Sequence, residues 1–139
     1  MVSTDVSYVL SFEEAAGIMR SAEEAFGQAD VARILSGYTL DIIIRFADLP
    51  EIQGIEAAEA FLKARFNRQK KYRLRKTLRT VMNNIIGGTW EGTWEDAKTG
   101  KQMKGRGSEF LTMRDGKVAE WDATFNTCEV GGAPVTPLL

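Results

Sequence analysis

Three acidic side chains stand where a small-molecule site could use a base: Asp122, Asp48 and Glu109. Asp122 lies in a stretch that alternates polar and aromatic residues, so it shares one strand face with Asn126 while Trp121 is on the other. If the polar face lined an apolar cavity, Asp122 could take a proton from a carbon acid or position a water molecule. We therefore treat these three carboxylates as the catalytic candidates.

Each carboxylate also has a structural interpretation. Asp122 would be solvated, at a subunit contact or paired with an arginine if the aromatic face lined the cavity instead. Glu109 would form an ion pair with Arg45 or Arg106. Asp48, two residues before a proline, would be an ordinary turn former. Paired acids would favour a non-catalytic binding module, whereas a lone acid facing a cavity would favour an enzyme.

Aromatic and polar side chains supply the candidates for ligand contact. Tyr38 could donate a hydrogen bond to a carbonyl or an oxyanion. Trp90 and Trp94 share a strand face and could form an aromatic pocket wall, although such pairs are also common in cores and interfaces. We expect a cavity bounded by the curved strands and by helix residues around Met19, Leu62 and Phe66. The predicted ligand-contacting residues are Tyr38, Phe66, Trp90, Trp94, Arg106 and Asn126.

The chain of 139 residues contains no histidine and a single cysteine, Cys128. This composition excludes Ser-His-Asp and Cys-His nucleophilic sites, imidazole bases and the common zinc sites. Any catalysis must therefore come from carboxylates, tyrosine, lysine, arginine or ordered water. We expect neither a metal nor a cofactor.

Charge is nearly balanced, with 18 basic and 19 acidic residues and a formal net charge of −1. Half of the basic residues lie in residues 63–79, which contain no acidic residue. We interpret this run as a helix end and a solvated or dimer-facing strand surface, and we expect no nucleic-acid partner. The chain has neither a signal-peptide pattern nor an apolar run long enough to span a bilayer, so we expect a cytoplasmic protein with no membrane partner.

Helix signals come early in the chain and strand signals come late. A capping-box spacing at Ser11 and Glu14 opens a helix that ends near Gly27, and a short helix follows Asp30. Residues 38–46 predict a strand, 48–54 a loop and 55–71 a third helix. Residues 72–82, 85–95, 102–113 and 117–126 predict strands before a loose tail.

This order favours one α+β domain over residues 1–139, with a core of about 8–130. The expected architecture is a curved antiparallel sheet wrapped around three helices and enclosing an apolar pocket. Apolar and aromatic strand faces would leave a patch in water, so we also expect a homodimer.

Several motifs resemble the nuclear transport factor 2-like superfamily, which includes ketosteroid isomerases, limonene epoxide hydrolase and SnoaL-like polyketide cyclases. The resemblance implies the cone-shaped α+β fold that these proteins share. The matching residues are Phe46-x-Asp48-x-Pro50, Gly54, Asp115-Gly116-Lys117-Val118 and Trp121-Asp122. Phe61-Leu62-x-x-Arg65-Phe66 followed by Tyr72-Arg73-Leu74-Arg75-Lys76 resembles a bacterial subgroup whose function is largely unassigned. Arg106, Glu109 and Asp122 could imitate the Asp-Arg-Asp set of the epoxide hydrolases.

The resemblance implies a domain that binds a small, largely apolar organic molecule. Cofactor-free isomerase, cyclase or hydrolase chemistry is one option, and a non-catalytic ligand-binding or dimerisation module is the alternative. One fold hosts both kinds of protein in this superfamily, so the residues leave open whether a reaction is catalysed.

Overall fold

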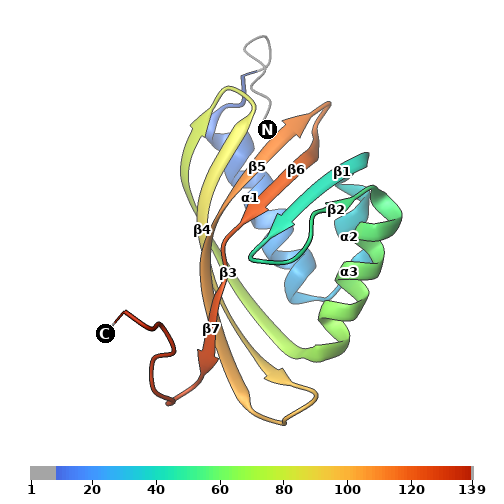
Figure 1. The fold of residues 1–139 in the computed structure, drawn as a ribbon. Coiled ribbons are helices and arrows are strands. Elements are labelled where there is room, and N and C mark those ends of the chain that lie inside the picture. The colour runs from blue at the N-terminus through green and yellow to red at the C-terminus, as the bar shows by residue number, and fades with distance from the viewer. Residues whose placement is uncertain (1–8, 139) are drawn as a thin grey trace.

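A computed structural model describes residues 9–138 and shows three helices packed against a curved sheet (Figure 1). The helices are α1 (Phe12–Gly27), α2 (Val31–Ser36) and α3 (Ile55–Arg68). The strands are β1 (Tyr38–Phe46), β2 (Ile52–Gln53), β3 (Gln69–Met82), β4 (Ile85–Asp96), β5 (Gln102–Arg114), β6 (Lys117–Ala123) and β7 (Asn126–Glu129).

Local side-chain contacts explain where the first two helices begin. The Glu14 backbone N–H donates to Ser11 Oγ at 3.0 Å, and the Ser11 N–H donates to Glu14 Oε1 at 3.2 Å, which completes the predicted capping box. Asp30 caps α2 by accepting from the Arg33 N–H at 3.1 Å. Both helix starts predicted from the sequence are confirmed.

The sheet is ordered β2-β1-β6-β5-β4-β3, and the short β7 pairs with β5. All neighbouring strands are antiparallel except β1 and β6, which are parallel, so the sheet is mixed rather than wholly antiparallel. The parallel pair arises because α3 and three long strands separate β1 from β6 along the chain, which provides the long crossover that parallel strands need. The predicted α+β cone is confirmed with this one difference.

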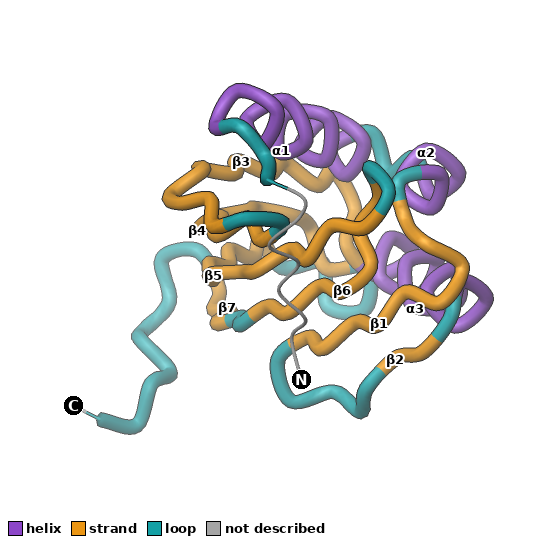
Figure 2. The backbone as a smooth tube through the Cα atoms, turned by 90° about the horizontal axis from the view of Figure 1, so that it is seen from above, coloured by secondary structure: helices purple, strands orange, loops and turns teal. Residues whose placement is uncertain are grey.

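The helices cover the concave side of the sheet in two groups. Figure 2 shows α1 running alongside β3, while α2 and α3 are grouped next to β1. The sheet bends between the two groups, and the buried apolar residues fill the space between helices and strands. No helix among residues 9–138 is long and apolar enough to cross a membrane.

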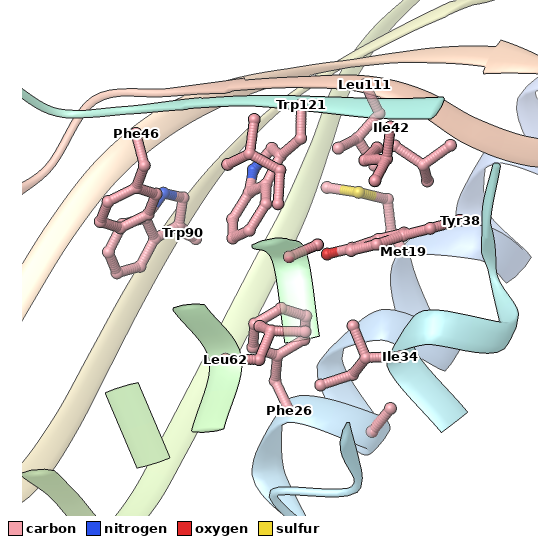
Figure 3. Packing of buried hydrophobic residues seen from close by; sticks show 14 of the residues in the cluster. Met19, Phe26, Ile34, Tyr38, Ile42, Phe46, Leu62, Trp90, Leu111 and Trp121 are labelled. Atoms are coloured by element: carbon pink, nitrogen blue, oxygen red, sulfur yellow. The ribbon is translucent and has the colours of Figure 1, made fainter. Parts of the chain in front are cut away.

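An aromatic cluster forms part of this core, and Figure 3 labels Phe46, Trp90 and Trp121 among its members. Phe46 lies 5.4 Å from Trp121 and 6.4 Å from Trp90, measured between ring centroids. The Phe125 ring stacks on Trp90 at 5.0 Å. Edge-to-face and offset contacts of this kind stabilise a core beyond the area they bury.

Phe125 reaches this cluster because the last predicted strand is interrupted. Residues 117–126 divide into β6 and β7, with the Thr124 N–H donating to the Ser108 carbonyl at 2.9 Å between them. Two glycines on β5 make room for the chain where it passes from β6 to β7. A Cβ at Gly107 would lie 2.0 Å from the Thr124 carbonyl oxygen, and a Cβ at Gly105 would lie 2.6 Å from the Phe125 ring. Only glycine fits this close approach of the chain.

Candidate functional site

A cavity of about 190 Å³ lies between α1, α2, the start of β1 and the inner face of the sheet. Its wall is mostly apolar and comes from all of these elements, with Ile18, Ala22, Phe26, Ile34, Leu111 and Val118 among the lining residues. Three polar side chains reach this wall from separate strands: Tyr38, Lys76 and Glu109. Exposed Ser21, Gly37 and Gly116 stand at its opening.

The polar end of the cavity is a buried ion pair. Lys76 Nζ lies 2.6 Å from Glu109 Oε2 and 2.8 Å from Glu109 Oε1, and the two side chains are 5% and 1% exposed. The Trp121 indole N–H donates to Glu109 Oε1 at 3.0 Å. The Phe26 ring lies 5.6 Å from the ammonium nitrogen, within the range of a cation–π contact.

Strand alternation explains why these two charges point inward. Lys76 shares the inner face of β3 with Tyr72, Leu74 and Leu78, and Glu109 shares the inner face of β5 with Leu111. The two strands are separated only by β4, so the long side chains can meet over it. Each charge then has the opposite charge as its main compensation for lost water.

Tyr38 begins β1 and lines the same cavity, with its hydroxyl directed into the core in Figure 3. Burial raises the pKa of this phenol well above its usual value; the Arg65 guanidinium opposes the shift and the Glu109 carboxylate adds to it. Tyr38 is therefore a neutral hydrogen-bond donor at any ordinary pH.

Asp122 does not line this cavity. Its carboxylate is 3.2 Å from Arg45 Nη1, and Arg45 also contacts Glu51 at 2.9 Å and Glu120 at 3.4 Å. The aromatic face of β6 is the inner one, because Trp121 packs against Phe26 and the rest of the aromatic cluster. The structure thus matches the ion-pair interpretation of Asp122, and its polar face is directed away from the cavity.

The other two carboxylates have different surroundings. Asp48 is exposed in the turn after β1 and is not among the cavity-lining residues. Glu109 is paired, as the structural interpretation expected, but with Lys76 rather than with Arg45 or Arg106. Arg106 could not form an ion pair with Glu109, because it is three positions away on β5 and its side chain is therefore on the opposite face of the strand.

The predicted ligand-contacting residues fall into three separate places. Tyr38 lines the cavity, whereas Phe66, Trp90 and Trp94 belong to the packed aromatic core. Leu62 and Phe66 do not line the cavity, so its helical wall comes from α1 and α2 rather than from α3.

Arg106 and Asn126 are paired across β5 and β7 on the outer face of the sheet. They line two overlapping grooves of about 630 and 730 Å³, together with Arg75, Glu91 and Thr136. These grooves are larger than the inner cavity but contain no buried acid or base, so the inner cavity is the better candidate for chemistry.

Two buried donors in the aromatic core have no hydrogen-bond partner within residues 9–138: Arg65 Nη1 and Trp90 Nε1. The other Arg65 nitrogens donate to Gln69 at 2.7 Å and to the Tyr72 hydroxyl at 3.0 Å. The guanidinium also lies 4.9 Å from the Phe46 ring centroid and near three other rings. Its charge is thus compensated mainly by aromatic faces.

Sequence reasoning missed Lys76, although the sequence contained a signal for it. Tyr72, Leu74 and Leu78 define the apolar face of β3. Because every second residue of a strand points to the same face, Lys76 is the one charged residue among them. This signal is masked because Lys76 lies within a basic run whose other strand members, such as Arg73 and Arg75, are exposed. The described residues contain no cluster of three histidine, cysteine or acidic side chains that could hold a metal ion.

Comparisons with solved structures identify the fold. A candidate polyketide cyclase from Xanthomonas campestris pv. campestris matches with a TM-score of 0.72 at 20% identity, over 82% of this chain and 91% of that one. An NTF2-like protein of unknown function from Burkholderia pseudomallei K96243 matches with a TM-score of 0.73 at 14% identity, over 84% and 92%. An LEH-like epoxide hydrolase from M. tuberculosis matches with a TM-score of 0.65 at 11% identity, over 82% and 84%.

No curated protein matches the sequence of this chain. At these identities the structural matches show a shared fold and no shared activity. The matches confirm the nuclear transport factor 2-like fold that the sequence motifs predicted. A family model described as "Protein of unknown function (DUF1348)" matches residues 9–133, and the chain therefore belongs to that family.

Proposed function

We propose that this domain binds a small, largely apolar molecule in the cavity between α1 and the inner face of the sheet. The observation that carries the proposal is the buried Lys76–Glu109 pair on the wall of an otherwise apolar cavity. Burying two charges has a desolvation cost that a well-packed apolar core avoids. A polar pair placed beside an open space is typical of a binding site with a few polar groups that fix ligand orientation.

The size of the cavity limits the ligand. At about 30 Å³ for each liquid water, 190 Å³ holds roughly six water molecules. Sites for drug-sized ligands usually enclose about 300–1,000 Å³. The ligand is therefore a compact molecule of a few carbons and not a polycyclic one.

The charges in the cavity also limit the ligand. Lys76 and Glu109 neutralise each other, and Arg33, which also lines the cavity, is paired with Glu24 at 3.1 Å. A charged ligand would therefore lose its water without gaining an unpaired counter-ion. An ammonium has three N–H donors and the Tyr38 hydroxyl adds another, which suits an acceptor oxygen on the ligand. The cavity therefore favours a neutral molecule with one carbonyl or hydroxyl oxygen.

Acid–base catalysis is the second candidate function. Glu109 could take a proton from a ligand carbon while Lys76 and Tyr38 hold the oxygen on which charge develops. The cyclase and epoxide hydrolase among the structural matches favour this alternative. The close pairing of Glu109 with Lys76 favours binding, because both carboxylate oxygens already accept hydrogen bonds from the ammonium.

Saturation-transfer NMR with butan-2-one, butan-1-ol and butane tests the binding proposal. We expect saturable binding of the ketone and the alcohol, and weaker binding of the alkane. Ala22→Leu fills the cavity from α1 and should abolish binding, whereas Arg106→Ala, on the outer sheet face, should leave it intact. Binding that persists in Ala22→Leu, or no binding by any of the three compounds, would contradict the proposal.

A further inference from the structure

We propose that Lys76 is a carbonyl-reactive amine and that the cavity takes a small aldehyde or ketone as a Schiff base on Lys76 Nζ. This inference rests on the proposed function, because the carbonyl compound must first enter that cavity. It adds a covalent step and a substrate class to simple binding.

The first support is the environment of the amine. All lysines of the chain lie within the described residues, and all except Lys76 are exposed. The Lys76 side chain is 5% exposed, and its nitrogen reaches an apolar cavity wall. Lys76 is thus the one lysine whose amine a carbonyl compound bound in the cavity can reach, which supplies the proximity that an addition step needs.

The second support is the carboxylate beside the amine. Both Glu109 oxygens lie within 2.8 Å of Nζ, so a proton can pass between the groups without any side-chain movement. Trp121 holds Glu109 Oε1 through its indole N–H at 3.0 Å, which keeps the carboxylate oriented toward the amine. Schiff-base formation needs a base at its start and an acid before its end, and one carboxyl group can serve as both.

The step balances without a further reagent. Glu109 takes a proton from the ammonium, and the freed nitrogen lone pair attacks the carbonyl carbon while the C=O π electrons move to oxygen. A proton passes from nitrogen to that oxygen through Glu109, which gives a carbinolamine. Glu109, still protonated, then protonates the hydroxyl, the C–O bond breaks, water leaves and the nitrogen lone pair forms the C=N bond.

Charge is conserved through this sequence. The initial ammonium–carboxylate pair becomes an iminium–carboxylate pair, so the buried site is neutral before and after the reaction. The Tyr38 hydroxyl lies on the same wall and can donate to the carbonyl oxygen as negative charge develops there. The low exposure of the site also slows hydrolysis of the product by bulk water.

Reductive trapping tests the inference on the whole protein. The chain is incubated with butanal and sodium cyanoborohydride, and peptide mapping by mass spectrometry measures the butylation rate of each lysine. We expect Lys76 to react roughly 10²-fold faster than the exposed lysines, the lower end of the usual gain from general acid–base catalysis. Equal or slower labelling of Lys76 in the wild-type protein overturns the inference.

Two further measurements separate this inference from the proposed function. Glu109→Gln keeps the shape of the side chain but removes the base, and should bring Lys76 labelling down to the rate of exposed lysines such as Lys104. Butan-1-ol has no carbonyl group and should bind the cavity without an adduct. If butan-1-ol binds and butanal leaves Lys76 unlabelled, the binding proposal stands and the Schiff base is wrong. If neither compound enters the cavity, both proposals fail.

Discussion

At the scale of single residues, the buried pair of Lys76 and Glu109 is the feature that separates this core from an ordinary apolar one. Both side chains are nearly inaccessible, and each is the main compensation for the charge of the other. Removing one partner leaves an uncompensated charge, whereas removing both leaves an apolar gap that the surrounding residues can partly fill.

This asymmetry predicts a specific pattern of stabilities. Glu109→Leu should lower the free energy of unfolding by about 3–5 kcal/mol, because Lys76 is left buried and unpaired. Adding Lys76→Met should restore most of that loss. Urea unfolding of the two single variants and the double variant measures the coupling. Additive losses in the double variant would show that the two charges do not depend on each other.

Individual residues also show how far sequence reasoning extends. The pairing of Glu109 could be predicted from its inward position, but its partner could not, because the partner comes from a strand two places away in the sheet. The face of β6 that lines the core could not be predicted either, since Asp122 and Trp121 alternate and only the three-dimensional neighbours decide between them. Lys76 was predictable in principle from its place among Tyr72, Leu74 and Leu78.

At the scale of elements, Asp96 joins the end of α3 to the turn between β4 and β5. Its carboxylate accepts from Arg68 Nε at 2.7 Å and from the Thr99 hydroxyl at 2.7 Å. The hydrogen bond from Arg68, followed by that from Thr99, lowers the pKa of Asp96 from 3.8 to about 2. Folding thus favours the ionised form of the Asp96 carboxyl.

The lowered pKa predicts how this junction responds to acid. The stabilisation from Asp96 should be complete above about pH 5, and should be lost as the pH falls from about 4 toward 2, where the folded protein also binds the proton. Urea midpoints of the wild-type protein and of Asp96→Asn should therefore differ at neutral pH and converge in acid. A difference that is the same at pH 6 and near pH 2 would contradict the assignment.

The crossing of β6 into β7 gives a second prediction at this scale. A Cβ on Gly107 would lie 2.0 Å from the Thr124 carbonyl oxygen, a backbone atom that cannot move without breaking the β6–β7 turn. Gly107→Ala should cost about 1–3 kcal/mol, the usual penalty of overpacking. Gly27→Ala is the matched control, because a Cβ there meets no atom within 4 Å. Equal thermal stabilities of the two variants would contradict this view of the crossing.

The elements themselves were largely predictable, because their boundaries are determined locally. The capping box of α1 and the Asp115-Gly116 turn depend on a few neighbouring residues, and the structure has both where the sequence predicts them. The break at Thr124 was not predictable, because polar and apolar residues alternate through it without interruption. The parallel pairing of β1 with β6 depends on contacts between distant segments, which local patterns do not record.

At the scale of the whole molecule, the outer face of the sheet is the surface through which we expect two copies to associate. Phe110 projects from β5 on this face and is 52% exposed, although large aromatic side chains are usually buried. Phe110→Glu should shift the protein from dimer to monomer in sedimentation velocity. Phe12→Glu, at the start of α1, changes a phenylalanine that is 62% exposed and should leave the dimer intact. A monomeric wild-type protein would contradict the expected homodimer.

The central claim is that the cavity beside Lys76 and Glu109 is the ligand site, and the Trp121 indole N–H reports on it directly. Of the three tryptophans, only Trp121 lines this cavity, and its indole N–H donates a hydrogen bond to Glu109. The decisive measurement is a titration of ¹⁵N-labelled protein with butan-2-one, with the indole resonances assigned by single Trp→Phe variants. We predict a saturable shift of the Trp121 indole resonance while those of Trp90 and Trp94 stay in place. A Trp121 resonance that does not move, or a shift confined to Trp90 or Trp94, would contradict the account.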